Sequence, residues 1–353
     1  MNPRAHAVRI AEVIAETAEA KTFVFAVPSG LAEHFAYRPG QFLTLRVPSA
    51  RTGSVARCYS LCSSPHLDPR PAVTVKRTAG GYASNLLCDT VSAGDTMTML
   101  EPGGVFGPRD LAADVLLCAG GSGITPVFSI VKSMLAVGRG RIVLLYANRD
   151  RPSVIFARQL ADLETRHPRR LRILHWLESE RGLPTAPGLA NVLRPYTALN
   201  WYACGPTGFL SVLDAAALRL RVRRVYREEF RSLDGNPFQE VVPATAALPT
   251  VPAGGFDAPV GAAATVDIEI DGATHTLDWP KHRRLLDVLL DSGIDAPYVC
   301  RESACGTCVC SVRRGRTRMV QHEALLDTEI AAGLTLACQT LPETQRVHIA
   351  FDQ

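Results

Sequence analysis

Four cysteines in the last part of the sequence constrain the fold more than any other feature. Cys300, Cys305 and Cys308 follow the spacing C-x4-C-x2-C, and Cys338 stands well downstream. Four thiolates in this pattern are typical of a plant-type [2Fe–2S] cluster. The small residues between the first three cysteines indicate a loop whose backbone N–H groups can turn toward sulfur. We therefore predict that these four cysteines ligate a [2Fe–2S] cluster.

Zinc and disulfides are the alternatives for this cysteine set. A structural zinc site usually shows two C-x2-C pairs or a Cys/His pattern, and only one C-x2-C pair is present. A disulfide framework fits poorly in a 353-residue chain with no recognisable secretory signal. Cys310 lies two residues beyond Cys308. The spacing assigns Cys308 as the ligand and leaves Cys310 as a buried strand residue.

Composition limits the class of protein. At 353 residues the chain exceeds what one core usually serves, so two or three domains are expected. No apolar run approaches the roughly 18 residues that span a bilayer, and no membrane association is predicted. Ten cysteines without an export signal indicate a reducing interior, which predicts a cytoplasmic protein.

Charge is unevenly distributed along the chain. Residues 263–353 carry 9 Lys/Arg and 13 Asp/Glu, whereas residues 1–262 carry 29 and 21. An acidic module on a basic body suggests electrostatic docking between the two, or of the module onto a partner. The arginines are scattered and form no basic–aromatic stripe, so nucleic-acid binding is not predicted.

The first 232 residues divide into two stretches that differ in the periodicity of their apolar residues. Residues 1–110 read as short strands separated by Gly/Pro turns, which predicts a small antiparallel β-barrel. Residues 111–232 alternate between apolar strands and helices, which predicts an α/β domain with a parallel sheet. The expected strands are Thr22–Val27, Phe42–Val47, Ala72–Arg77 and Thr96–Leu100 in the first stretch, and Asp114–Ala119, Ile142–Ala147, Leu171–Trp176 and Trp201–Cys204 in the second, with helices near 156–166 and 206–220.

Two further segments complete the organisation. Residues 233–262 are rich in Pro, Ala and Gly and are predicted to be a linker. Residues 263–353 then form a separate module. It opens with a strand pair around 265–277 joined by Asp271-Gly272, which is a strong hairpin signal.

A second motif, Arg57-Cys-Tyr-Ser60, falls on a barrel strand. Tyr59 can stack on a ring system, Ser60 can hydrogen-bond a ring edge, and Arg57 can grip a phosphate. Gly81 and Ser84 then open a helical pattern, and a helix N-terminus with small residues can cradle phosphate. Each motif alone also fits an ordinary strand or a capped helix. Together on one barrel they predict a flavin site.

A glycine-rich turn, Gly120-Gly-Ser-Gly-Ile-Thr-Pro126, joins a predicted strand to a helix. Pro126 replaces the third glycine of a dinucleotide fingerprint, but the turn still lets a pyrophosphate approach backbone N–H groups. A later turn begins at Cys204, which fits either a small buried residue or a place beside a nicotinamide. Arg149 could receive a 2′-phosphate, yet Asp150 adjoins it. NADH is therefore expected rather than NADPH.

The order of these motifs resembles the ferredoxin–NADP reductase superfamily fused to a C-terminal ferredoxin, as in reductase components of multicomponent oxygenases. Longer stretches, among them 57–65, 144–150 and 285–290, resemble the reductase of 3-ketosteroid 9α-hydroxylase. The resemblance covers nearly the whole chain. It implies an antiparallel β-barrel flavin domain, an α/β parallel-sheet nucleotide domain and an α+β (β-grasp) ferredoxin domain, with FAD rather than FMN.

The resemblance also implies roles for individual residues. Tyr59 packs on the isoalloxazine ring, Thr125 lies near the hydride-transfer site, and Glu228 belongs to a Glu-x-Phe element close to the flavin. Thr125, Cys204 and Glu228 are the implied catalytic residues. The implied cofactor-binding residues are Arg57, Tyr59, Ser60, Val75, Lys76, Gly81, Ala83, Ser84, Gly121, Gly123, Gly205, Pro206 and Phe230.

Electron counting links the three sites. A nicotinamide gives two electrons as a hydride, a [2Fe–2S] cluster takes one at a time, and a flavin can exchange either. We predict a monomeric reductase that passes electrons from NADH through FAD and the cluster to a Rieske-type terminal oxygenase acting on a steroid. The alternatives are the reductase of another oxygenase, such as phenylacetyl-CoA epoxidase or an aromatic hydroxylase, and an iron–sulfur redox sensor without turnover.

Overall fold

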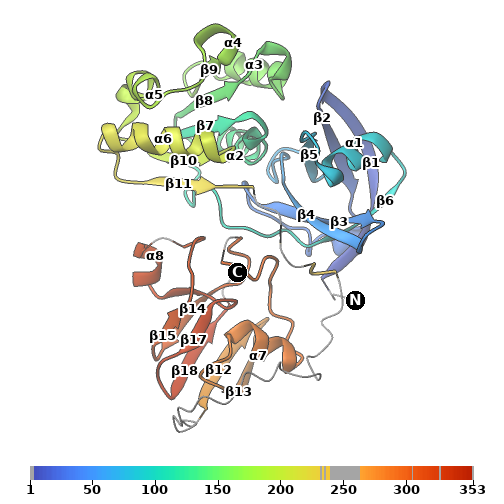
Figure 1. Ribbon diagram of the computed structural model, residues 1–353, viewed down its shortest axis with the longest axis vertical. Coiled ribbons are helices and arrows are strands. Elements are labelled where there is room, and N and C mark those ends of the chain that lie inside the picture. The colour runs from blue at the N-terminus through green and yellow to red at the C-terminus, as the bar shows by residue number, and fades with distance from the viewer. Residues whose placement is uncertain are drawn as a thin grey trace. The chain divides into compact units, whose positions relative to one another are not determined.

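The computed structural model describes residues 4–230, 233, 236–238, 263–303, 305–325 and 327–351. Its contacts divide the chain into two compact units (Figure 1), of which the first is Arg4–Leu233 and the second holds the described C-terminal residues. Nearly all of the predicted linker, 233–262, lies outside the described residues. Among the described residues, no helix is long and apolar enough to cross a membrane.

The first unit begins with a six-stranded antiparallel sheet in the order β4-β3-β6-β1-β2-β5. An isolated bridge between Leu61 and Val73 joins its two edge strands and closes the barrel. Fully buried side chains such as Phe23 and Leu43 fill the interior. The strands are β1 (Ala5–Thr17), β2 (Ala20–Ala26), β3 (Phe42–Ser49), β4 (Gly53–Ser60), β5 (Ala72–Lys76) and β6 (Thr96–Leu100).

The helix α1 (Tyr82–Thr90) covers the barrel beside β5. Its Ala83 and Leu87 side chains are buried in the barrel core. The turn before it contains Gly80 at φ +69°, a backbone conformation that glycine adopts without strain. The predicted barrel and its phosphate-loop helix are therefore both present.

A five-stranded parallel sheet in the order β11-β10-β7-β8-β9 forms the rest of the first unit. Central strand β7 is buried along its whole length because helices cover both faces. Alternate residues enter two cores: Leu117 faces one with α2 and α3, and Leu116 faces the other with α5 and α6. The elements are β7 (Val115–Gly120), α2 (Ile124–Val137), β8 (Ile142–Asn148), α3 (Ala157–Arg166), β9 (Leu171–Leu177), α4 (Glu178–Arg181), α5 (Ala186–Leu193), β10 (Asn200–Cys204), α6 (Thr207–Arg219) and β11 (Val225–Glu228).

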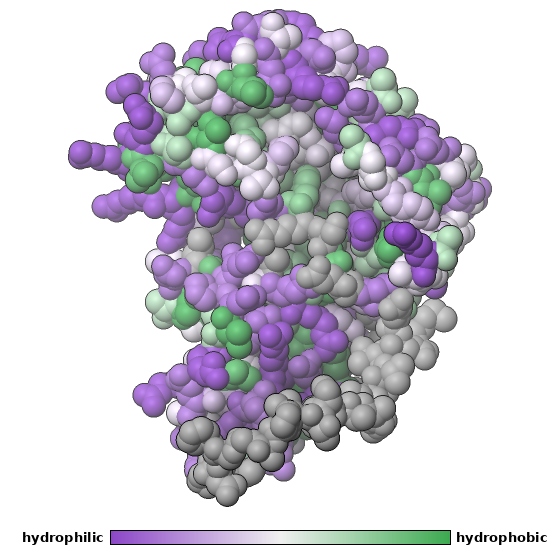
Figure 2. All heavy atoms as spheres, in the orientation of Figure 1, coloured by the Kyte–Doolittle hydropathy of each residue, from purple (hydrophilic) through white to green (hydrophobic). Residues whose placement is uncertain are grey.

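Hydrophilic side chains cover most of the first unit on the face that Figure 2 shows. Large apolar side chains that remain exposed, such as Leu183 and Leu218, are isolated along the sequence. Most large apolar side chains of the first unit are instead buried, in the barrel core or in the two cores of the parallel sheet.

The second unit is an α+β fold around a mixed sheet in the order β13-β12-β18-β14-β16. Asp271 (φ +50°) and Gly272 (φ +75°) form the two-residue turn that the sequence predicted between β12 and β13. Strand β18 pairs in parallel with β12. The elements are β12 (Ala264–Ile270), β13 (Ala273–Trp279), α7 (Leu285–Asp291), β14 (Val309–Arg314), β15 (Thr317–Met319), α8 (Asp327–Ala331), β16 (Leu334–Leu336), β17 (Thr340–Pro342) and β18 (Arg346–Ala350).

We expect Ile268→Ala to destabilise the second unit by about 2–5 kcal/mol, because this β12 side chain is fully buried in the core of that unit. Calorimetry of the full chain should show one unfolding transition shifted and the other unchanged. Thr274→Ala, at an exposed position on β13, is the control. Equal shifts of every transition with Ile268→Ala would show that the two units unfold together, contrary to this expectation.

Candidate functional site

The cysteine loop turns its backbone amides toward sulfur. The N–H groups of Glu302 and Cys305 donate to Cys300 Sγ at 3.3 and 3.4 Å, and that of Thr307 donates to Cys305 Sγ at 3.5 Å. Arg301 (φ +59°) and Ser303 (φ +66°) adopt the left-handed conformation within this loop. Such N–H groups stabilise thiolate charge, so the loop fits an iron–sulfur cluster.

The four predicted ligands come together as two pairs. The thiol of Cys305 is hydrogen-bonded with that of Cys300, and Cys308 with Cys338. The hydrogen bond with Cys300, together with burial, raises the pKa of Cys305 well above its usual value. The hydrogen bond with Cys308 lowers the pKa of Cys338, which also accepts from the backbone of Ser303. Two thiol pairs suit a centre with two irons, each iron taking two sulfurs.

Cys310 lies apart from this donor set. It is 2% exposed on β14, and its Sγ hydrogen-bonds the Thr335 carbonyl oxygen at 3.8 Å. The side chain belongs to the core of the second unit. This agrees with its predicted role as a buried strand residue.

The predicted flavin motif occupies the end of β4. Ser60 is buried, and Arg57 donates from Nη1 to the carbonyl oxygen of Ala56 at 2.7 Å. Burial raises the pKa of the Tyr59 hydroxyl. Val75 is fully buried in the barrel core, whereas Lys76 at the end of β5 is partly exposed. The motif thus presents both aromatic and polar groups from one strand.

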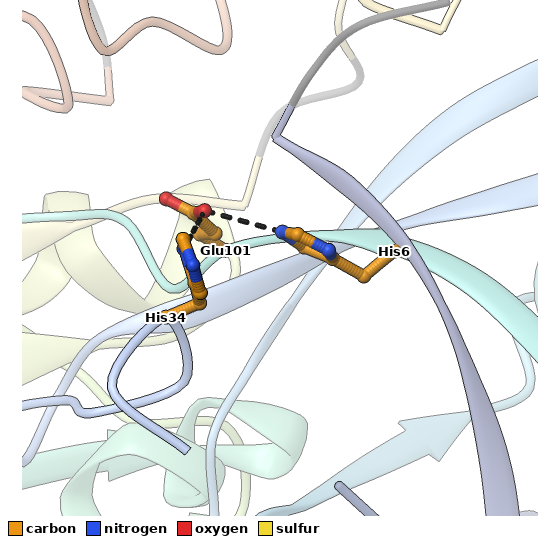
Figure 3. A group of neighbouring side chains, drawn as sticks. All are labelled: His6, His34 and Glu101. Atoms are coloured by element: carbon orange, nitrogen blue, oxygen red, sulfur yellow. Dashed lines mark hydrogen bonds and ion pairs between the residues drawn. The ribbon is translucent and has the colours of Figure 1, made fainter. Parts of the chain in front are cut away.

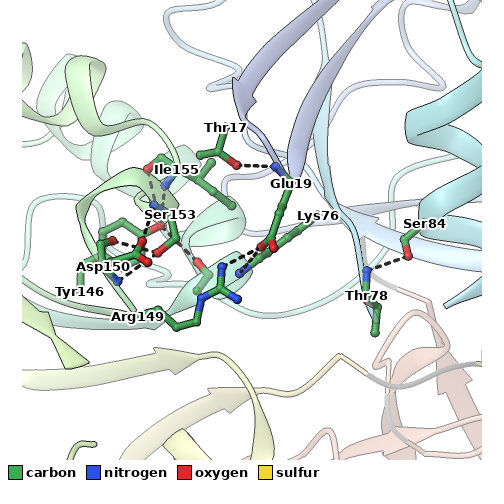
Figure 4. Close-up of polar contacts among 11 residues, drawn as sticks. Thr17, Glu19, Lys76, Thr78, Ser84, Tyr146, Arg149, Asp150, Ser153 and Ile155 are labelled. Carbon is green, nitrogen blue, oxygen red and sulfur yellow. Dashed lines mark hydrogen bonds and ion pairs between the residues drawn. The ribbon is translucent and has the colours of Figure 1, made fainter. Parts of the chain in front are cut away.

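The predicted phosphate loop is held by its own hydrogen bonds. Ser84 Oγ accepts from the backbone N–H of Thr78 at 3.1 Å (Figure 4). A Cβ atom on Gly81 would lie 2.9 Å from Thr78 Cβ, so the turn needs glycine. Ala83 points into the barrel core rather than toward the loop. The N-terminus of α1 leaves backbone N–H groups available to a phosphate.

Two backbone turns interlock at the carboxyl edge of the parallel sheet. A Cβ atom on Gly123 would lie 2.1 Å from the carbonyl oxygen of Cys204, and one on Gly205 would lie 3.0 Å from the backbone nitrogen of Gly120. Pro206 follows as the cap of α6. Ligands of parallel sheets bind at this edge, and the N-terminus of α2 faces it. The turns therefore fit the pyrophosphate of a nicotinamide dinucleotide.

Two buried side chains lie at the same edge of the sheet. Thr125 is 2% exposed and donates from Oγ1 to the Ser122 carbonyl oxygen at 3.0 Å. Asn148, at the end of β8, is 5% exposed, and its Nδ2 has no hydrogen-bond partner among the described residues. The Asn148 side chain interacts with the Tyr146 hydroxyl, and its amide remains a donor that a nucleotide oxygen could satisfy. No motif indicated Asn148 beforehand.

Glu228 joins the nucleotide sheet to the flavin strand. It ends β11 directly beside Cys204 of β10, and its Oε2 accepts from Ser60 Oγ of β4 at 3.5 Å. Burial raises the pKa of the Glu228 carboxyl to about 8. Burial and the nearby Glu228 also raise the pKa of the Cys204 thiol well above its usual value. Three predicted residues therefore meet here, while Phe230 beyond them is exposed.

Glu19, Lys76 and Arg149 form an ion-pair group that the sequence did not predict (Figure 4). Arg149 Nη2 contacts Glu19 Oε2 at 3.1 Å, and Lys76 Nζ lies 4.0 Å from the same oxygen. Lys76 Nζ is also 3.8 Å from the place a Cβ of Gly121 would occupy. Both cations therefore stand near the expected dinucleotide.

His6, His34 and Glu101 form a separate polar group on the barrel (Figure 3). Glu101 Oε1 lies 3.2 Å from His6 Nε2 and 2.7 Å from His34 Nδ1. Its other oxygen contacts Arg4 Nη1 at 3.3 Å. The carboxylate thus already has a cationic partner, and the group links the start of β1 to the end of β6.

Three family models match the chain in succession. The oxidoreductase FAD-binding domain matches residues 7–107, the oxidoreductase NAD-binding domain matches 117–214, and the 2Fe-2S iron-sulfur cluster binding domain matches 268–343. The protein is therefore an oxidoreductase that uses FAD, NAD(H) and a [2Fe–2S] cluster. The residues described above supply a donor set that fits each group.

Relatives of similar length narrow the class. The ferredoxin reductase component of 3-ketosteroid-9-alpha-monooxygenase from Mycobacterium tuberculosis (strain CDC 1551) is 50% identical over 98% of this chain and 95% of that protein. One of the polypeptides of the 1,2-phenylacetyl-CoA epoxidase from Escherichia coli (strain K12) is 32% identical over 98% of both. The structure of phthalate dioxygenase reductase shares the fold, with a TM-score of 0.55, 23% identity and 98% coverage of each chain.

These relatives place the chain among oxygenase reductases that join a flavin domain, a nucleotide domain and a ferredoxin domain. Within that class, it belongs to the family of the ferredoxin reductase components of 3-ketosteroid-9-alpha-monooxygenase.

We expect Cys308→Ser to abolish the visible absorption of the cluster and to lower the iron content of the purified protein, because a thiolate ligand is lost. Cys310→Ser is the matched control, two residues away in a buried position, and should keep both. Loss of iron in the control alone would assign the ligand to Cys310 instead.

We expect Gly123→Ala to raise the KM for NADH at least tenfold, because the added methyl group would force the two interlocked turns apart. Gly208→Ala, at the start of α6 with no atom within 4 Å of its Cβ position, is the control. Steady-state kinetics of ferricyanide reduction would measure the KM for NADH of both variants. Equal KM values for the two variants would contradict a nucleotide site at these turns.

Proposed function

We propose that this chain carries electrons from NADH to the Rieske-type terminal oxygenase of a 3-ketosteroid 9α-hydroxylase. The observation that carries the proposal is the contact between Ser60 of the flavin motif and Glu228, which lies beside Cys204 of the nucleotide turn. This contact brings the predicted hydride donor and acceptor sites together within one compact unit. The 50% identity to a steroid monooxygenase reductase supports the choice of oxygenase.

The site residues divide the work of binding. A bound FAD would supply the chemistry that links two-electron hydride transfer from the nicotinamide to one-electron transfer toward iron. We assign Arg57 and the α1 N-terminus to its phosphates, and Tyr59 and Ser60 to its ring. The interlocked turns at Gly123 and Gly205 would hold the dinucleotide, with the buried Thr125 fixing the first turn of α2. Orientation of the two rings is then the main contribution of the protein.

Glu228 is suited to hold a proton at this junction. With a pKa raised to about 8 by burial, its carboxyl is mostly protonated at neutral pH. Once protonated, the Glu228 carboxyl can instead donate to the Ser60 hydroxyl, 3.5 Å away, and Ser60 can then pass its own proton toward the flavin site. Cys204, whose thiol stays neutral because its pKa is raised, would pack beside the nicotinamide without adding charge.

We expect NADH-dependent ferricyanide reduction to fall as the pH rises through about 8, since Glu228 loses its proton there and the protonated form is the competent one. Glu228→Gln should lower kcat by about 10²-fold, as loss of a general acid does, and should remove the pH transition. FAD content is the control for folding. An unchanged pH profile in the variant would rule out Glu228 as the titrating group.

The choice of partner is tested by reconstitution. The purified chain would be combined with NADH and either a 3-ketosteroid 9α-oxygenase or the oxygenase subunits of phenylacetyl-CoA epoxidase. We expect product only with the steroid oxygenase. Product only with the epoxidase would favour the alternative that the 32% identical relative represents.

The proposal includes the state and location of the protein. Iron-ligating thiolates need a reducing compartment, which supports the cytoplasm. We propose a monomer, because both sites are built from residues of one chain. Light scattering of the loaded protein tests this, and a mass near 38.1 kDa is expected.

A further inference from the structure

Glu19 contributes a carboxylate from the barrel to the edge of the nucleotide sheet. It lies in the turn between β1 and β2, where its backbone N–H donates to Thr17 Oγ1 at 3.2 Å and its carbonyl oxygen accepts from Arg77 N–H at 2.7 Å. These bonds fix the residue at the tip of the hairpin. Its side chain reaches Arg149 Nη2 at 3.1 Å (Figure 4).

Arg149 stands where a parallel-sheet site reads the adenosine ribose. It follows β8, whose Ala147 pairs with Gly120 of the glycine turn. In dinucleotide sites, the end of the strand after that turn carries an acidic residue for a ribose hydroxyl, or an arginine for a 2′-phosphate. By its position alone, Arg149 would therefore favour NADPH.

The neighbouring Asp150 does not offset this charge. Its Oδ1 accepts from the backbone N–H of Ser153 at 3.0 Å, which holds the carboxylate within its own turn. The carboxylate that contacts the Arg149 guanidinium is that of Glu19. Lys76 Nζ lies 4.0 Å from the same carboxylate, so one acid faces two cations.

We propose that Glu19 makes this reductase discriminate against NADPH. The Glu19 carboxylate pairs with the Arg149 guanidinium, which would otherwise be available to bind the 2′-phosphate. The negative charge of Glu19 would also repel that phosphate directly. Specificity of this kind comes from a repulsive element rather than from a better contact with the preferred ligand. Both side chains are roughly half exposed, so the pair contributes little to folding and its substitution should leave the fold intact. The inference rests on dinucleotide binding at the Gly120–Gly123 turn.

The test compares Glu19→Gln with Glu12→Gln in the FAD-loaded full chain. Glu12 is exposed on β1 of the same hairpin, so its variant makes the same change in charge away from the sheet edge. Calorimetry would measure binding of 2′,5′-ADP and of 5′-AMP. We expect Glu19→Gln to tighten 2′,5′-ADP at least tenfold more than 5′-AMP, and to raise kcat/KM for NADPH at least tenfold relative to NADH. Glu12→Gln should leave both ratios unchanged.

Two further measurements sharpen the test. The gain should disappear in the Glu19→Gln, Arg149→Met double variant, and it should shrink in 1 M salt, which screens exposed charges within about 3 Å. An equal gain for 5′-AMP, or an equal gain in Glu12→Gln, would overturn the proposal. Failure of NADH to reduce the parent protein would instead refute the proposed function.

Discussion

The approach of Gly123 to the carbonyl oxygen of Cys204 is the constraint on which the first unit depends. With 2.1 Å between that oxygen and a would-be Cβ, no other residue fits without separating β7 from the turn after β10. β7 and β10 are adjacent parallel strands, and Glu228 pairs with Cys204 at the end of β10. The close approach therefore also fixes the positions of Glu228 and of the N-terminus of α2 relative to the turns. One missing side chain thus sets the geometry of several functional groups.

Burial then determines the chemistry of that junction. The pKa values of Glu228 and Cys204 are raised for the same reason, because removal from water disfavours the charged form of each group. A site with two neutral acids can accept an uncharged nicotinamide ring and still supply a proton. The cations lie apart, at Lys76 and Arg149, on the side where phosphates would bind. Charge is therefore separated along the expected dinucleotide.

Local patterns predicted most of the fold and the cluster, whereas contacts between distant segments escaped them. Strands such as β7 and the Asp271-Gly272 hairpin were predictable because periodicity and turn chemistry act over a few residues. The long strand β1 was not predicted, since its alternation is broken by register shifts after Ile10 and Ala15. Glu19 belongs to no recognisable motif. It lies 130 positions before Arg149 in the sequence, and only the fold brings the two side chains into contact. The roles assigned to individual flavin and nicotinamide residues stay predictions.

The sheet of the second unit has an implication for biosynthesis. Strand β18 follows all four predicted cysteine ligands in sequence, yet it lies at the centre of the sheet between β12 and β14. The scaffold beneath the cysteine loop is therefore incomplete until the ribosome has synthesised Arg346–Ala350. Iron delivered earlier would meet thiols without their supporting sheet, so assembly of the metal centre belongs after translation of this strand rather than alongside it.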